Sequence, residues 1–180
     1  ADAALAKLQQ AVAIDPANDD ARYDYVKLLL ERGALEQAQA AFEPVARKAV
    51  TEARLEALAL WIAAQRAATG ARTPQALGAA IAANKRDFDA RHELAQCHFA
   101  AGRFTDAMDE LLEIVMRDKA WNDNLARRTY VAILAVLAKP LPKPAAGDAK
   151  STLELTGKSA APAGDPVVDA YRRKLSMALF

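Results

Sequence analysis

Gly33-Ala34-Leu35-(x2)-Ala38-(x3)-Phe42-(x2)-Val45 recurs in this chain as Gly102-Arg103-Phe104-(x2)-Ala107-(x3)-Leu111-(x2)-Ile114. The two copies lie about two 34-residue units apart, a spacing typical of stacked helix-turn-helix repeats. In each copy the glycine is placed to end a first helix, where a left-handed backbone conformation is often needed. The small alanine lets the second helix approach its neighbour closely, and the large apolar residue one turn later fills the space between repeats. The pattern therefore predicts an all-α repeat protein that binds other polypeptides.

Composition agrees with a helical domain that has one continuous core, since 53% of the 180 residues are apolar. A net charge of +1 gives no general attraction to nucleic acid or to anionic lipid. The sequence has no apolar run long enough to cross a bilayer, and an amphipathic helical pattern stands where a signal peptide would be. The single cysteine, Cys97, fits a reducing compartment. We therefore expect a cytoplasmic protein with no nucleic-acid or membrane partner.

Apolar residues at helical spacing indicate the order of the helices. The chain up to Asp15-Pro16 matches the second half of a repeat whose first half is missing, so we expect a piece of a longer protein. Further helices are expected from a cap at Asp19 or Asp20 to Arg32, from Leu35 with a break near Pro44, twice within 53–83 as a degenerate repeat, and over 88–101, 104–116 and 124–138.

The last part of the chain differs in composition. Residues 139–164 are rich in proline, alanine and glycine, which predicts a flexible insertion between a repeat domain over 1–138 and a final helix over 165–180. That helix should start at Asp165-Pro166, and its apolar stripe should cover the exposed end of the repeats; the stripe is formed by Val168, Tyr171, Leu175 and Leu179. The expected fold is an all-α, tetratricopeptide-like helical repeat solenoid with a C-terminal capping helix.

Residues that carry chemistry elsewhere give no convincing site here. A zinc-protease helix needs its second histidine where this chain has Gln96, and His98 follows His92 by six residues, which places it on another helix face. Cys97 fits a core position better than an activated thiol. The segment 156–159 lacks the earlier glycine of a phosphate-binding loop, and the carboxylates within 106–113 are typical of a solvated helix face. We therefore expect no catalytic, metal or cofactor site; an enzyme using His92, Cys97 and His98 is the least favoured alternative.

Partner contacts are expected on the concave groove that stacked repeats form, mainly from their first helices. Exposed positions near Arg22, Tyr23, Arg91 and His92 are the candidates for peptide contact. For any one of these residues, ordinary solvated surface is an equally weighted alternative.

Two blocks of sequence resemble a known family. The first is Arg117-Asp118-(x2)-Trp121-Asn122-Asp123, followed by Arg127-(x)-Thr129. The second is Tyr171-Arg172-Arg173-Lys174-Leu175, between Asp165-Pro166-Val167-Val168 and Ala178-Leu179-Phe180. With these blocks the chain resembles, over nearly all its length, the C-terminal half of the YbbN-type thioredoxin-like co-chaperones, also called chaperedoxins.

This resemblance implies a repeat region that follows an N-terminal thioredoxin domain in the full-length protein. It implies a stress-response holdase that binds client proteins and passes them to the chaperonin and the DnaK system. It further implies that the final helix docks on the chaperonin, with Leu179 and Phe180 as contact residues and Arg172, Arg173 and Lys174 assisting electrostatically. The alternative of the same broad class is a generic repeat scaffold that recruits one dedicated partner or mediates oligomerisation.

Overall fold

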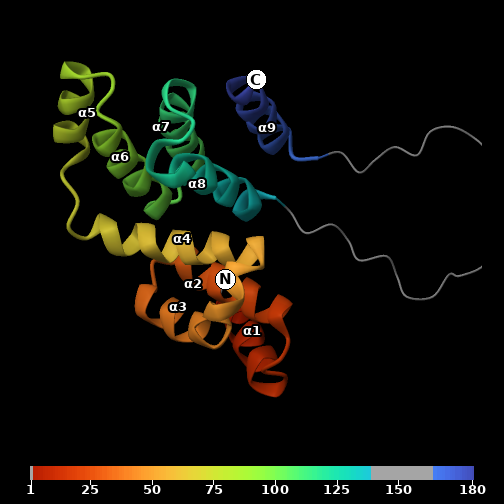
Figure 1. The fold of residues 1–180 in the computed structure, drawn as a ribbon. Helices are drawn as coiled ribbons and strands as arrows, with labels where there is room; N and C mark the ends of the chain where they lie inside the picture. The colour runs from red at the N-terminus through yellow and green to blue at the C-terminus, as the bar shows by residue number, and fades with distance from the viewer. Residues whose placement is uncertain (1, 139–163) are drawn as a thin grey trace, which may run out of the picture.

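The computed structural model describes residues 2–138 and 164–180, and within these ranges it contains helices and no strands. The elements, shown in Figure 1, are α1 (Asp2–Ile14), α2 (Asp19–Glu31), α3 (Leu35–Phe42), the 3-10 helix η1 (Glu43–Val50), α4 (Ala53–Ala68), α5 (Pro74–Ala83), α6 (Phe88–Ala100), α7 (Phe104–Arg117), α8 (Trp121–Leu137) and α9 (Pro166–Leu179). Apart from Gly164, the insertion expected over 139–164 lies outside the described residues. No described helix is long and apolar enough to cross a membrane.

The repeated sequence pattern forms two helical hairpins, α2–α3 and α6–α7, as predicted. Gly33 and Gly102 both have a left-handed backbone, with φ of 70° and 72°. A hydrogen bond of 2.9 Å closes each turn, from Ala34 N to the Leu29 carbonyl and from Arg103 N to the His98 carbonyl. The small positions Ala38 and Ala107 are fully buried. Each glycine therefore ends a helix, and each alanine lies at a close helix contact.

The first hairpin is interrupted where the sequence places Pro44. Helix α3 ends at Phe42, and the chain continues as the 3-10 helix η1 with Pro44 in its first turn. Proline lacks the N–H that a continuing α-helix needs, so the break occurs at the predicted place. The cap of α2 differs from the prediction: the Asn18 side chain, rather than that of Asp19 or Asp20, accepts the hydrogen bond from Ala21 N at 3.0 Å.

Helix α4 lies between the two hairpins and packs on both. Figure 1 shows it running between α1–α3 on one side and α6–α9 on the other. Trp61 is buried and stacks on Phe99, with ring centroids 5.6 Å apart, while Phe104 meets its face edge-on. The Gln65 amide donates hydrogen bonds to carbonyls near the ends of α2 and α6, at 2.9 Å and 3.5 Å. One helix thus joins the two hairpins into a single core.

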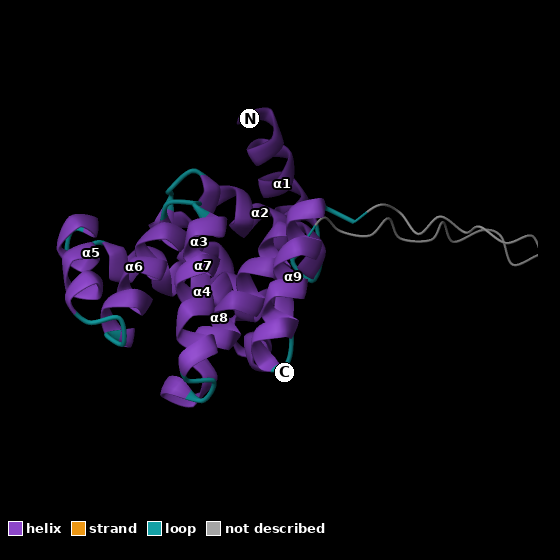
Figure 2. Cartoon of the chain, turned by 90° about the horizontal axis from the view of Figure 1, so that it is seen from above, coloured by secondary structure: helices purple, strands orange, loops and turns teal. Residues whose placement is uncertain are grey.

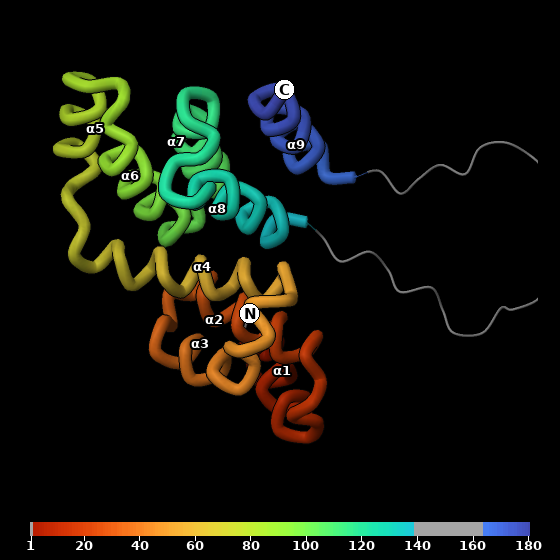
Figure 3. The backbone as a smooth tube through the Cα atoms, in the orientation of Figure 1, coloured from red at the N-terminus to blue at the C-terminus, as the bar shows by residue number. Residues whose placement is uncertain are grey.

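Helix α5 is displaced from the position that a regular repeat would give it. The sequence predicts its cap correctly, because the Thr73 side chain accepts a hydrogen bond from Ala76 N at 3.2 Å. However, α5 packs on α6 instead of forming a hairpin with α4, and Leu77 and Ile81 belong to a separate small core with Ala90 and Leu94. Figure 3 shows an extended segment between the end of α4 and the start of α5. Figure 2 shows α5 and α9 on opposite sides of the molecule.

Helix α9 covers α7 and α8, as expected of a capping helix. Its N-cap is Asp165, whose side chain accepts a hydrogen bond from Val167 N at 2.9 Å. Val168, Tyr171 and Leu175 are buried, whereas Leu179 is half-buried. The Tyr130 hydroxyl donates a 2.7 Å hydrogen bond to the Tyr171 carbonyl, which fixes α9 on α8.

Candidate protein-binding site

Arg22 and Arg91 are structural residues, which corrects the expectation that these positions are exposed. Their exposed fractions are 6% and 5%. Arg22 donates hydrogen bonds to the carbonyls of Pro16 at 3.1 Å and Ala41 at 3.0 Å. Arg91 donates to the Lys85 carbonyl at 3.2 Å and to the Glu110 carboxylate at 2.7 Å. In both repeats, therefore, the arginine fastens the turn before its helix to the helix that follows.

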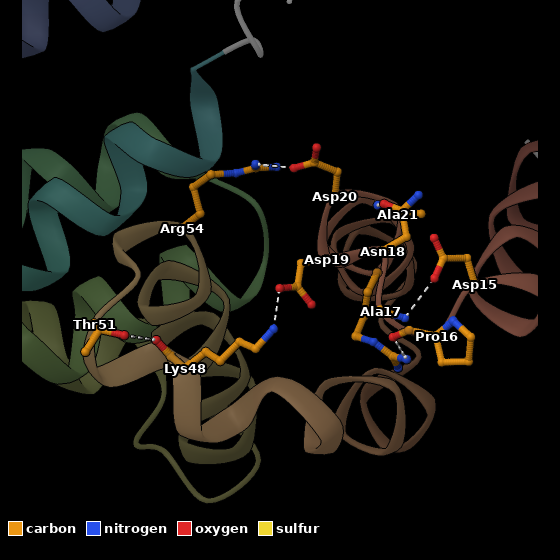
Figure 4. Close-up of polar contacts among 11 residues, drawn as sticks. Asp15, Pro16, Ala17, Asn18, Asp19, Asp20, Ala21, Lys48, Thr51 and Arg54 are labelled. Atoms are coloured by element: carbon orange, nitrogen blue, oxygen red, sulfur yellow. Dashed lines mark hydrogen bonds and ion pairs between the residues drawn. The ribbon is translucent and has the colours of Figure 1, made fainter.

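Ion pairs connect the start of α2 to the two elements that follow α3. Asp19 pairs with Lys48 and Asp20 with Arg54, and Figure 4 shows both pairs bridging from α2 to η1 and to α4. The Arg54 guanidinium also lies 4.2 Å from the centre of the Tyr23 ring. Tyr23 is only 5% exposed, and burial raises its pKa. The expected exposure of Tyr23 is therefore wrong as well.

His92, Cys97 and His98 do not converge on one cleft. His92 is half-buried, with its ring 5.3 Å from that of Trp121, and burial lowers its pKa. His98 accepts a hydrogen bond from Arg103 Nε at 3.0 Å, at the other end of α6. Cys97 packs against the small core under α5, and burial raises its pKa, which disfavours the nucleophilic thiolate. Among the described residues, no group of three or more side chains of the metal-binding types is placed to hold an ion.

Three of the five C-terminal residues expected to contact a partner lie around one apolar hollow. Arg172, Leu179 and Phe180 on and after α9 face Val131, Leu134 and Ala135 of α8, with Leu175 and Ser176 completing the lining. The hollow has a volume of about 430 Å³. Phe180 is fully exposed, and Met177 nearby is 74% exposed. An open apolar hollow beside exposed large apolar groups is a typical mark of a protein contact surface.

The other two basic residues of α9 lie outside this hollow. Lys174 binds Asp109 of α7 at 3.3 Å, and its ammonium group lies 4.1 Å from the centre of the Tyr171 ring. Lys174 therefore holds α9 against α7. Arg173 is exposed and does not line the hollow. Of the three cations, Arg172 is the one placed beside the apolar lining.

Sequence reasoning missed the contribution of α8 to this surface. Val131 is 45% exposed, although the neighbouring Tyr130 is completely buried. The sequence does carry a signal, because neighbouring residues of a helix lie about 100° apart, so the apolar Val131 lies on a different face from Tyr130. Val131 becomes part of the hollow only because α9 packs beside α8, and this packing cannot be read from the sequence of α8 alone.

Comparison with known families agrees with the geometry of the hairpins. Two family models, both described as tetratricopeptide repeat, match residues 1–62 and 65–153. The chain therefore belongs to the tetratricopeptide repeat proteins, and it is a protein–protein interaction module of this class. Neither the curated proteins nor the solved structures gave a match.

Proposed function

We propose that this chain is the interaction region of a thioredoxin-like co-chaperone, which binds client proteins and docks on the chaperonin through the end of α9. Two features support the proposal beyond the tetratricopeptide repeats: the resemblance of the blocks at 117–129 and 165–180, and the hollow between α8 and α9. Recruitment of the DnaK system follows from the same resemblance.

The hollow between α8 and α9 is the observation that carries the proposal. Burial of Val168, Tyr171 and Leu175 holds the body of α9, while Met177 and Phe180 remain exposed. The Lys119 ammonium group also donates a 2.6 Å hydrogen bond to the Leu179 carbonyl, which connects the last turn of α9 to the turn between α7 and α8. A preorganised apolar surface loses little conformational entropy when a partner covers it.

A capture experiment with purified chaperonin tests this function. The full chain should bind, and a chain lacking residues 176–180 should not, provided that circular dichroism shows an intact helical fold. Val50→Asp is a control variant. Like Met177 and Phe180, Val50 is a large apolar residue that is exposed, but it lies at the end of η1, away from α9 in the chain. Equal capture of the full and shortened chains would show that α9 is only a cap.

Suppression of aggregation separates a holdase from a scaffold with one dedicated partner. A holdase reduces light scattering from an unrelated protein that is unfolding. The scaffold alternative predicts no effect on that protein.

A further inference from the structure

A second hollow continues the first one along α8. It lies between the start of α4 and the first half of α8, and its volume is about 300 Å³. Val131 and Ala135 line both hollows. The two hollows are therefore adjacent. We call them together the α8 groove, and Val131 and Ala135 on the outer face of α8 form their common floor.

The α8 groove changes from polar to apolar along the helix. Arg127, Val131 and Ala135 are spaced four residues apart, so they form one stripe about 12 Å long. Arg127 and Arg128 lie at the end near α4, and the apolar residues lie at the end near α9. Because Arg172 lies beside the apolar end, the groove matches a partner whose apolar residues are flanked by charged residues on both sides.

The charges of the groove favour an acidic partner. Arg127 is exposed and has no ion pair or hydrogen bond with any residue in the described part of the chain. Arg172, in the other hollow, has a loose ion pair of 3.6 Å with Asp169, and both side chains are about half exposed. The Glu56 carboxylate is already bound by Arg128, at 2.7 Å and 3.2 Å. The guanidinium groups of Arg127 and Arg172 thus remain available to carboxylates of a partner. Among the described residues that line the groove, Asp123 is the one side-chain carboxylate not bound to an arginine or lysine.

We propose that the α8 groove binds an amphipathic helix of a partner protein, with apolar residues over Val131 and Ala135 and carboxylates facing Arg127 and Arg172. A helix is the fitting form, because its residues at four-residue spacing can lie along the stripe formed by Arg127, Val131 and Ala135. The proposal rests on the proposed function in one respect, that the surface beside α9 binds a partner. Beyond the proposed function, the contact surface extends to the start of α4 and the partner helix is acidic.

The test uses two designed helical peptides with the same leucine face, one with glutamate and one with lysine on the polar face. Fluorescence anisotropy measures their binding to the full chain at low and high salt. The acidic peptide should bind more tightly, and salt should reduce the difference. Arg127→Glu should weaken binding of the acidic peptide by about fivefold or more, because it replaces an attraction by a repulsion. Ala135→Glu should weaken it further by blocking the apolar floor.

Two further variants separate a local effect from net charge. Arg66→Glu makes the same charge change on an exposed part of α4 that is about 15 Å along the helix from Glu56, and it should leave binding nearly unchanged. Asp123→Asn should strengthen binding of the acidic peptide about twofold, since it removes a like charge.

The proposal is overturned if neither peptide binds, if both bind equally, or if Arg66→Glu weakens binding as much as Arg127→Glu. It is also overturned if sedimentation shows a dimer that Ala135→Glu dissociates, because the groove would then hold a second copy of this chain. Chaperonin capture that persists while peptide binding fails would leave the proposed function standing without this groove.

Discussion

Arg22 and Arg91 show how single residues carry the repeat. Each donates to a carbonyl six residues earlier and to an acceptor 19 residues later. The helix caps repeat as well, since the side chains of Asn18 and Asp87 accept hydrogen bonds from the third residue after them. These carbonyl and carboxylate acceptors compensate most of the cost of burying the two guanidinium groups, although Arg22 Nε is buried without a hydrogen-bond partner among the described residues. A contact role for Arg22 or Arg91 therefore conflicts with their structural one.

Three residues at the start of α8 have a left-handed backbone without being glycine. Asn122, Asp123 and Asn124 have φ of 46°, 53° and 62°. Asparagine and aspartate tolerate this conformation better than other side chains do, but it still carries strain. Asn124→Ala should lower the free energy of unfolding by about 1 kcal/mol, whereas Asn124→Gly should keep or raise it. Urea denaturation measures both.

In a regular helix alanine should be more stabilising than glycine, the reverse of the order expected at position 124. At Ala63, which is exposed in the middle of α4, glycine should cost about 1 kcal/mol relative to alanine. If alanine were also the better residue at position 124, α8 would begin with a right-handed turn.

His92 makes stability depend on pH. Burial lowers its pKa in the folded chain, against a smaller opposing effect of Asp89. Between the lowered value and the unfolded value of about 6.5, the unfolded chain binds more protons. The contribution of His92 is therefore fully present above the unfolded pKa and is lost as the pH falls below it. The free energy of unfolding should fall from pH 7.5 to pH 5.5, and it should fall less in His92→Phe.

A second histidine must be separated from this effect. The pKa of His98 is also lowered, by burial and by Arg103. His98→Gln provides the comparison, and the double variant should show the smallest dependence on pH. An unchanged pH profile in His92→Phe would contradict the burial of this ring.

At the scale of elements, the hairpins depend on the close approach that alanine permits. Ala107 has an exposed fraction of 0% in α7. Ala107→Leu should cost about 1 to 3 kcal/mol, because the added atoms push α6 and α7 apart. Thr105→Leu, an exposed change in the same helix, is the matched control for helix propensity. A thermal midpoint that is equal in the two variants would contradict the repeat register.

The sequence predicts those elements whose signals are local. The glycine turns, the break at Pro44 and the stripe of α9 follow from spacing and from backbone chemistry. The position of α5 could not be predicted in this way, because it depends on whether Leu77 packs on α6 or on α4, and both choices bury it. The left-handed start of α8 was hidden too, since Trp121-Asn122-Asp123 also fits an ordinary helix start.

For the whole molecule, α4 decides how the repeats are arranged. A regular solenoid would pair α4 with α5, but here α4 packs on α8 as well as on α6. This arrangement places the start of α4 beside α8 and creates one side of the α8 groove. The sequence indicated the C-terminal part of the site, at Arg172, Leu179 and Phe180. It could not indicate Glu56 or Arg127, because they meet only when α4 packs on α8. The bond between Arg128 and Glu56, which are 72 residues apart, shows this packing.

Hydrogen exchange of the chain with and without purified chaperonin shows directly whether the surface of α8 and α9 binds the partner. The last turn of α9 has an exposed end, so its amides should exchange rapidly in the free chain. The chaperonin should slow exchange at 172–180 and at the groove-lining part of α8, and it should leave exchange in α1 and α5 unchanged. Protection confined to α1 or α5, or absent from the described helices, would contradict it.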